Sequence, residues 1–148
     1  MVSMITTTNP YPHAGSMSLE QHPGAREAVK QADSRKLHIL AIDDQEDILY
    51  ILQDVLQTSG HLVSTAGSGA AGLQAAAQEQ PDLILLDIEM PGIDGFQVLH
   101  QLQQSVTTAR IPVYFMSGST NPELWERARQ LGARRCCASP LTSLRCIG

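Results

Sequence analysis

Short aliphatic runs alternate with helical patterns along most of this 148-residue chain. The expected strands cover residues 37–43, 61–66, 82–87, 111–117 and 134–139. The expected helices cover about 45–60, 69–80, 95–104, 121–132 and a short last segment, 140–148. Strands and helices that alternate in this way, joined by loops of a few residues, indicate an α/β fold that is doubly wound around a parallel sheet.

Residues 1–36 differ in composition from the rest of the chain. They are rich in Ser, Thr, Pro and His and contain few large apolar residues, so we expect a mostly disordered tail. Residues 37–148 carry the strand and helix patterns. The hydrophobic content of 43% is enough for one domain with a core of its own, and we expect that domain to span 37–148.

Net charge and cysteine content limit the classes of protein to which this chain can belong. The net charge of −5 gives no electrostatic footprint for nucleic acid or an anionic membrane. The sequence shows neither an apolar run of about 20 residues, which a membrane span needs, nor the layout of a signal peptide. Three cysteines, Cys136, Cys137 and Cys146, lack paired CxxC spacing and suggest reduced thiols. We therefore expect a cytoplasmic protein.

Polar residues end the expected strands. The carboxyl ends of parallel strands meet at one edge of the sheet, and sites form in the crevice there. We therefore expect five side chains to approach one another, those of Asp43, Asp44, Asp87, Ser117 and Ser139.

Three of these side chains are carboxylates, and the most telling is Asp87. It directly ends the most apolar strand, where a charged group is costly. Packed anions repel, so a cluster of Asp43, Asp44 and Asp87 favours a bound cation, and oxygen ligands favour Mg²⁺ over zinc. Asp44 has an alternative role as the cap of the helix that starts near Gln45.

These landmarks carry a family resemblance. An acidic pair, Asp43 and Asp44, follows the first strand; "DIEMPGIDG" follows the third; Ser117 and Gly118 follow the fourth; "GA…SPL" surrounds the fifth. In these features residues 37–144 resemble the receiver domain of two-component response regulators. The resemblance implies a flavodoxin-like (βα)5 fold, a five-stranded parallel sheet in the order 2-1-3-4-5. The last helix would be shortened.

The resemblance also implies a chemistry. Asp87 would accept a phosphoryl group from a phosphohistidine of a sensor histidine kinase or phosphotransfer protein. Asp44, Asp87 and the backbone carbonyl of Glu89 would bind Mg²⁺, and Asp43 would act through a bound water. Ser117 would hydrogen-bond a phosphoryl oxygen.

Further positions follow from the same resemblance. Gly118 would belong with Ser117 to the segment that moves on phosphorylation. Glu89 and Ser119 would lie at the two positions that tune the lifetime of the phosphoryl group.

The sequence departs from the family at two positions. Ser139 stands where a lysine is expected, and Cys136 stands where an aromatic residue is expected. No lysine follows Lys36, and Arg110 and Arg134 begin strands at the opposite edge of the sheet. We therefore predict a site that is short of one positive charge.

The helix expected at 121–132 has recognisable ends. Asn121 is a suitable N-cap, and Pro122 suits the first helical position. Gly132 ends the helix.

Trp125 lies on this helix. Leu124, Ala128 and Leu131 form the expected inward stripe, so Trp125 should point outward and could contact a partner protein. The alternative is a ring packed along the neighbouring strand surface.

Together these features predict a stand-alone receiver that signals to an unknown downstream protein target by protein contact. We expect no enzyme activity beyond self-phosphotransfer and autodephosphorylation at Asp87, and no nucleic-acid or membrane partner. The first alternative is a pseudo-receiver that binds partners without phosphorylation. An aspartyl-nucleophile phosphohydrolase is a weaker alternative, because Asp87 is not followed by the second aspartate and Gly-Thr of such enzymes.

Overall fold

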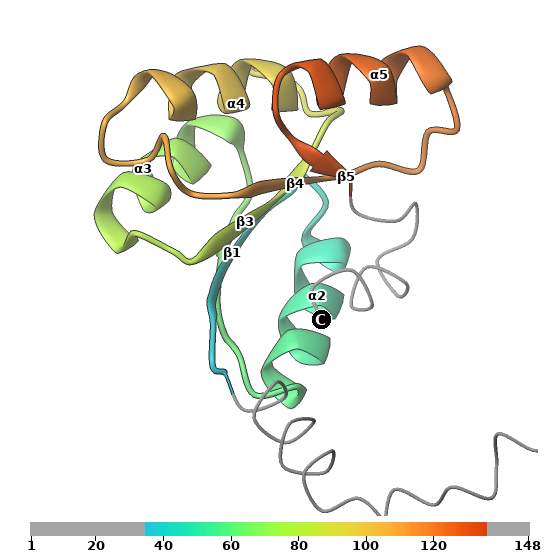
Figure 1. Ribbon diagram of the computed structural model, residues 1–148. Helices are drawn as coiled ribbons and strands as arrows, with labels where there is room; N and C mark the ends of the chain where they lie inside the picture. The colour runs from blue at the N-terminus through green and yellow to red at the C-terminus, as the bar shows by residue number, and fades with distance from the viewer. Residues whose placement is uncertain (1–34, 136–148) are drawn as a thin grey trace, which may run out of the picture. The chain divides into compact units, whose positions relative to one another are not determined.

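The computed structural model describes residues 35–135. The strands are β1 (His38–Ile42), β2 (Leu62–Ala66), β3 (Leu83–Asp87), β4 (Val113–Met116) and β5 (Arg134–Arg135). The helices are α2 (Glu46–Thr58), α3 (Gly69–Glu79), α4 (Gly95–Gln104) and α5 (Pro122–Gln130). The elements from β1 to α5 begin and end within two residues of their expected bounds, and strands alternate with helices as predicted (Figure 1).

All the strand pairs are parallel, and the strands lie side by side in the order β2-β1-β3-β4-β5. This confirms the predicted α/β class and parallel sheet. Of the expected strand 134–139, Arg134 and Arg135 are described, and the short helix expected at 140–148 lies outside the described residues. The predicted tail, 1–36, also lies outside them except for its last two residues.

Helices cover both faces of the sheet (Figure 1). Alternate residues of β1 point to opposite faces, as in any strand. Ile39 and Ala41 pack with α2 in one apolar cluster, whereas Leu40 and Ile42 pack with α3, α4 and α5 in the other. Since β3 is buried on both faces, its run of aliphatic residues needs no polar alternation.

Side-chain caps fix the starts of α3, α4 and α5. Asn121 accepts a hydrogen bond from the Glu123 amide (3.0 Å) with Pro122 in the first turn, as predicted. Asp94 and Gln97 form a capping box at the start of α4, an arrangement that was not predicted from the sequence. None of the helices between residues 35 and 135 is long and apolar enough to cross a membrane.

Candidate functional site

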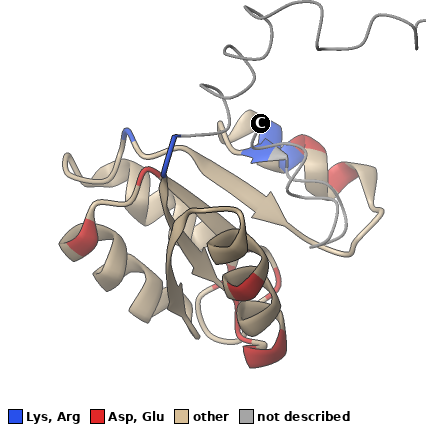
Figure 2. Cartoon of the chain, turned by 90° about the horizontal axis from the view of Figure 1, so that it is seen from below, with Lys and Arg blue, Asp and Glu red and all other residues tan. Residues whose placement is uncertain are grey.

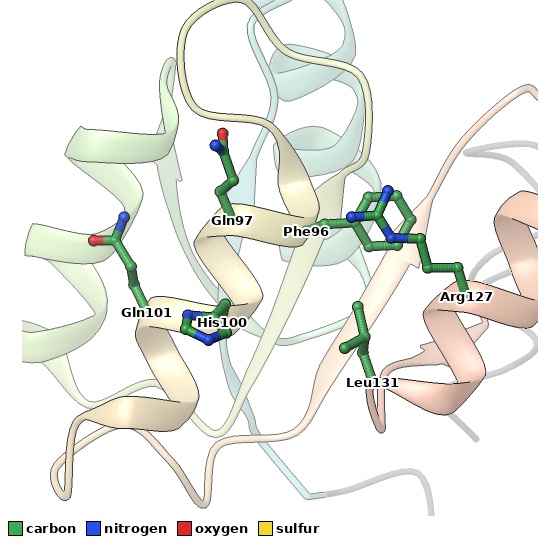
Figure 3. Close-up of a pocket in the computed structure, with 6 residues that line it drawn as sticks. All are labelled: Phe96, Gln97, His100, Gln101, Arg127 and Leu131. Atoms are coloured by element: carbon green, nitrogen blue, oxygen red, sulfur yellow. The ribbon is translucent and has the colours of Figure 1, made fainter.

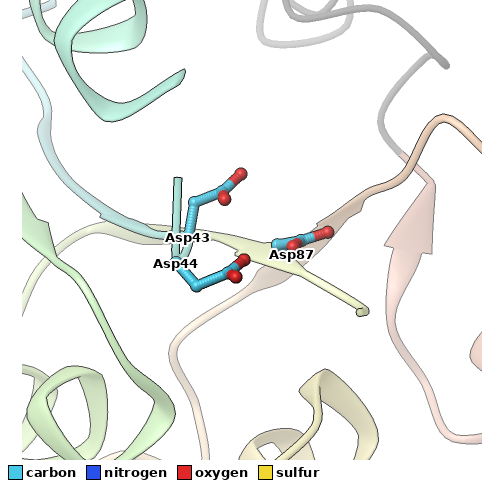
Figure 4. Close-up of side chains that lie close together, drawn as sticks. All are labelled: Asp43, Asp44 and Asp87. Carbon is cyan, nitrogen blue, oxygen red and sulfur yellow. The ribbon is translucent and has the colours of Figure 1, made fainter. Parts of the chain in front are cut away.

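Three carboxylates meet at the carboxyl edge of the sheet. Asp43 and Asp44 follow β1, and Asp87 ends β3, the strand beside it. One carboxylate oxygen from each residue lies within 4.8 Å of those from the other two. Figure 4 shows the Asp44 carboxylate directed toward Asp87. The structure therefore brings together the three acidic residues that the sequence pattern predicts at this edge.

The three carboxylates differ in exposure. Asp43 is buried, Asp87 is half-buried and Asp44 is exposed. Asp43 accepts a hydrogen bond from the Gln45 amide (2.9 Å), and Asp87 accepts a longer one from the Glu89 amide (3.4 Å). Gln45 is the N-cap of α2, and no side chain caps that helix. Asp44 therefore does not have the capping role that was its alternative explanation.

Crowding changes the acid strength of the cluster. Burial, followed by repulsion from Asp43 and then Asp44, raises the pKa of Asp87 to about 7. Burial also raises the pKa of Asp43 above its ordinary value, against the hydrogen bond from Gln45. A cation at the site would relieve both effects.

The donor set fits a small divalent cation. All three side chains offer carboxylate oxygens, the ligands that Mg²⁺ prefers. One oxygen from each carboxylate lies within 4.8 Å of the other two, so the three side chains are close enough to hold one cation between them.

The loop between β3 and α4, residues 88–94, is named the acceptor loop. It is anchored in the core by Ile88 and Met90, both buried. Gly95, at the start of α4, donates its amide hydrogen to the Ile88 carbonyl (2.9 Å). A Cβ atom at Gly95 would collide with the Asp87 carbonyl oxygen and lie 2.8 Å from the Ile88 Cα. Glycine at this position lets α4 pack directly on the backbone of Asp87.

The loop between β4 and α5, residues 117–121, is named the readout loop. Ser117 follows Met116, the residue of β4 that pairs with Asp87, so it lies next to the carboxylates along the sheet edge. The Ser117 hydroxyl is nearly buried and accepts a hydrogen bond from the Ser119 amide (3.0 Å). The hydroxyl proton remains available to a further acceptor. Gly118 lies between the two serines.

Trp125 packs inward, so the predicted outward orientation is wrong and the alternative, a packed ring, holds. The residue is 8% exposed and belongs to the core cluster on the α3–α4–α5 face. Its indole nitrogen donates a hydrogen bond to the Ser119 carbonyl (2.9 Å). Ala128 is buried beside it, whereas Leu124 and Leu131 are only partly buried. The large ring takes the central inward position because its N–H finds an acceptor in the readout loop.

The positions that depart from the family, Cys136 and Ser139, lie outside the described residues. Within 35–135, the groups that shift the pKa of Asp87 are carboxylates and backbone amides, with no cation among them. Figure 2 shows basic positions of α5 and β5 close to one another, and two of these arginines have partners other than the carboxylates at the sheet edge. Arg129 pairs with Glu126 (2.7 Å), and Arg134 donates to the Tyr114 hydroxyl (3.1 Å).

A separate groove of about 400 Å³ lies between α4 and α5 (Figure 3). The Arg127 guanidinium lies over the Phe96 ring, 4.3 Å from its centre. Leu131 adds to the apolar part of the lining, and His100 belongs to the polar part. This stacking engages a third arginine, Arg127 of α5, away from the carboxylates. The groove contains no carboxylate, and we assign it no chemistry.

Residues 39–144 match the response regulator receiver domain family, and the chain belongs to that family. It is thus a receiver domain of the two-component signalling class. Protein PilH of Pseudomonas aeruginosa is 36% identical over 105 residues, which are 70% of this chain and 85% of PilH. Sporulation initiation phosphotransferase F of Bacillus subtilis is 32% identical over 102 residues, 69% of this chain and 81% of that protein.

Solved structures agree with the fold. The chemotaxis protein CheY4 of Vibrio cholerae superposes with a TM-score of 0.71 at 26% identity, over 76% of this chain and 97% of that one. The flavodoxin-like, parallel α/β fold predicted from the sequence is therefore correct. Other curated relatives are longer: the match spans 24% of a probable cyclic di-GMP phosphodiesterase of Vibrio cholerae.

Proposed function

We propose that this chain is a receiver that accepts a phosphoryl group on Asp87 from a phosphohistidine of a sensor histidine kinase or phosphotransfer protein. The observation that carries the proposal is the meeting of Asp43, Asp44 and Asp87 within 4.8 Å at the carboxyl edge of the sheet. In the transfer, an Asp87 carboxylate oxygen forms a bond to phosphorus as the phosphorus–nitrogen bond breaks. The imidazole nitrogen leaves with the electron pair and takes up a proton from water, and Asp87 becomes an acyl phosphate.

We propose Mg²⁺ as the cofactor. Asp44, Asp87 and the backbone carbonyl of Glu89 would bind it directly, and Asp43 would do so through a water. When bound, Mg²⁺ offsets the negative charge of the carboxylates and of the phosphoryl oxygens. Because the pKa of Asp87 is raised to about 7, the residue is only partly ionised near neutral pH without a cation. A bound cation would favour the ionised, nucleophilic form.

We propose that Ser117 contacts the phosphoryl group. Its oxygen accepts from the Ser119 amide, which leaves its proton to donate to an oxygen of the phosphoryl group. Glu89, in the acceptor loop, and Ser119, in the readout loop, would influence the lifetime of the acyl phosphate.

We further propose that the receiver domain spans 37–148 and follows a separate N-terminal segment, 1–36. The relation to PilH, which is matched over 85% of its length, supports a stand-alone receiver. Its output would be contact with a downstream protein in the cytoplasm, without nucleic-acid binding and without turnover of a separate substrate.

A pseudo-receiver that binds partners without phosphorylation is the second candidate. The observation that favours it is Ser139 at the position of the family lysine. Arg127, Arg129 and Arg134 are engaged elsewhere, so none of them supplies the absent charge in this structure.

Intact-mass spectrometry separates the two candidates. After incubation with Mg²⁺ and acetyl phosphate, the receiver gains about 80 Da, the mass of one added HPO₃ group. Asp87→Asn loses the adduct, and Asp54→Asn, an exposed position on α2, keeps it. An unmodified wild-type chain, with acetyl phosphate and with candidate kinases, would instead support the pseudo-receiver.

A further inference from the structure

The readout loop is held by a series of hydrogen bonds between close neighbours. Ser117 accepts from the Ser119 amide (3.0 Å), and the Ser119 hydroxyl oxygen accepts from the Asn121 amide (3.2 Å). Asn121 in turn caps α5 through the Glu123 amide. Each bond joins residues two positions apart in the sequence, so an unbroken series of hydrogen bonds runs from the sheet edge to the start of α5.

One contact ties this loop to the body of the domain. The indole N–H of Trp125 donates to the Ser119 carbonyl (2.9 Å), and the ring is 8% exposed. Ser119 therefore has three bonds: its amide to Ser117, its hydroxyl to Asn121 and its carbonyl to Trp125. Ser119 is thus bonded both to Ser117 and to the indole, so a displacement of Ser117 would act on the residue that Trp125 contacts.

The ring also borders the outer surface. Together with Thr120, Pro122, Glu126 and Arg134 it lines a groove of about 560 Å³ along α5 and β5. A shift of the indole would change the shape of this groove. Trp125 thus connects the loop that carries Ser117 with the exposed face of α5.

We infer that Trp125 is a positioning residue that couples Ser117 to α5 when Asp87 is phosphorylated. The inference rests on the proposed function. Ser117 donates its hydroxyl proton to a phosphoryl oxygen, the Ser119 amide follows it, and the bond from Trp125 to the Ser119 carbonyl lengthens or turns. Trp125 does not touch the phosphoryl group; it acts through Ser119.

Other aromatic side chains in the described part of the chain are less suited to this role. Phe96 and Phe115 pack edge to face in the core, 5.2 Å apart, and carry no polar group. Tyr114 bonds Arg134, away from the readout loop.

The indole N–H resonance tests the inference, because the chain contains one tryptophan and gives one such signal. The ¹⁵N-labelled full chain is compared before and after addition of Mg²⁺ with beryllofluoride, an analogue of the phosphoryl group. We expect the signal to move in the wild type and in Ser117→Thr, which keeps the hydroxyl. We expect it to stay in place in Ser117→Ala, although Mg²⁺ still binds.

The affinity for beryllofluoride is a second test, because it would not change if Trp125 served only to stabilise the fold. Trp125→Phe keeps a ring and removes the N–H donor, so beryllofluoride affinity should fall about 2- to 10-fold, as for the loss of one hydrogen bond. Mg²⁺ affinity should not change. Tyr114→Phe, which removes the hydroxyl that Arg134 contacts, is the matched control and should leave both affinities unchanged.

The outcomes are separable. An indole signal that stays fixed while acetyl phosphate modifies Asp87 would overturn the inference and leave the proposed function intact. A signal that moves equally in Ser117→Ala would overturn the route through Ser117. A chain that neither gains the adduct nor responds to beryllofluoride would overturn both proposals.

Discussion

The two loops that border Asp87 are held in different ways. The acceptor loop is held by burial and close packing, with Ile88 and Met90 in the core and Gly95 pressed against the Asp87 backbone. The readout loop is held by hydrogen bonds between neighbouring residues, which can be exchanged at low cost. Packed interiors resist deformation, whereas short polar loops rearrange. We therefore expect the acceptor loop to stay fixed and the readout loop to be able to move.

The largest effect should come from the packing at the acceptor loop. Gly95→Ala places a methyl group against the Asp87 carbonyl and the Ile88 Cα, which are backbone atoms that cannot turn aside. We expect a loss of about 3 kcal/mol in the free energy of unfolding, measured in urea. Gly67→Ala is the matched control, since a Cβ there meets nothing within 4 Å, and it should change stability by less than about 0.5 kcal/mol. Equal losses in both variants would contradict the close-packed acceptor loop.

The second-largest effect should be the gain in unfolding free energy when Mg²⁺ binds to the carboxylates. At a concentration about 100 times its Kd, a ligand that binds only the folded state adds about 2.7 kcal/mol. Asp44→Asn should lose most of this gain at the same Mg²⁺ concentration, measured by thermal or urea unfolding. Asp54→Asn should keep it. If Asp44→Asn kept the full gain, the exposed carboxylate would not be a ligand.

The raised pKa of Asp87 predicts a pH-dependent stability. Because its pKa is about 7 in the folded chain and close to 3.8 when unfolded, ionisation favours the unfolded state as pH rises between those values. Asp87→Asn removes this penalty. Without Mg²⁺, the variant should be more stable than the wild type by about 1–2 kcal/mol at pH 8, allowing for solvent screening. At pH 4 the gain in stability should nearly vanish. Urea unfolding at both pH values measures the gain, and equal gains at pH 4 and pH 8 would contradict the raised pKa of Asp87.

The smallest effect should come from the helix N-caps, one of which also belongs to the readout loop. Asn121→Ala and Ser68→Ala each remove an N-cap and should each cost about 1 kcal/mol in unfolding free energy. Asn121 also ends the readout loop, so only Asn121→Ala should change beryllofluoride affinity. Titration of both variants measures this, and equal affinities would show that the readout loop does not depend on its cap.

The fold and the carboxylate cluster are predictable from local patterns and a topology rule. The aliphatic run Leu83–Leu86 predicts a strand buried on both faces, and parallel strands bring their carboxyl ends to one edge. The positions of Asp43, Asp44 and Asp87 then need no further information. The cap at Asn121 could be predicted for the same reason, since its chemistry is local.

The features that sequence patterns did not predict depend on contacts between distant segments. The orientation of Trp125 depends on a carbonyl in the readout loop, and helical spacing does not show where that carbonyl points. The need for glycine at position 95 arises where α4 approaches the Asp87 backbone. One signal was present in the sequence: Asp94 followed three residues later by Gln97 is the pattern of a capping box.

The most direct test of the central claim is chemical trapping of the phosphorylated residue. Borohydride reduces an acyl phosphate on aspartate to homoserine, and peptide mapping then identifies the position. After treatment with Mg²⁺ and acetyl phosphate we predict homoserine at position 87 alone, and none when Mg²⁺ is chelated. Homoserine at another aspartate, or none at position 87 in the presence of Mg²⁺, would contradict the account.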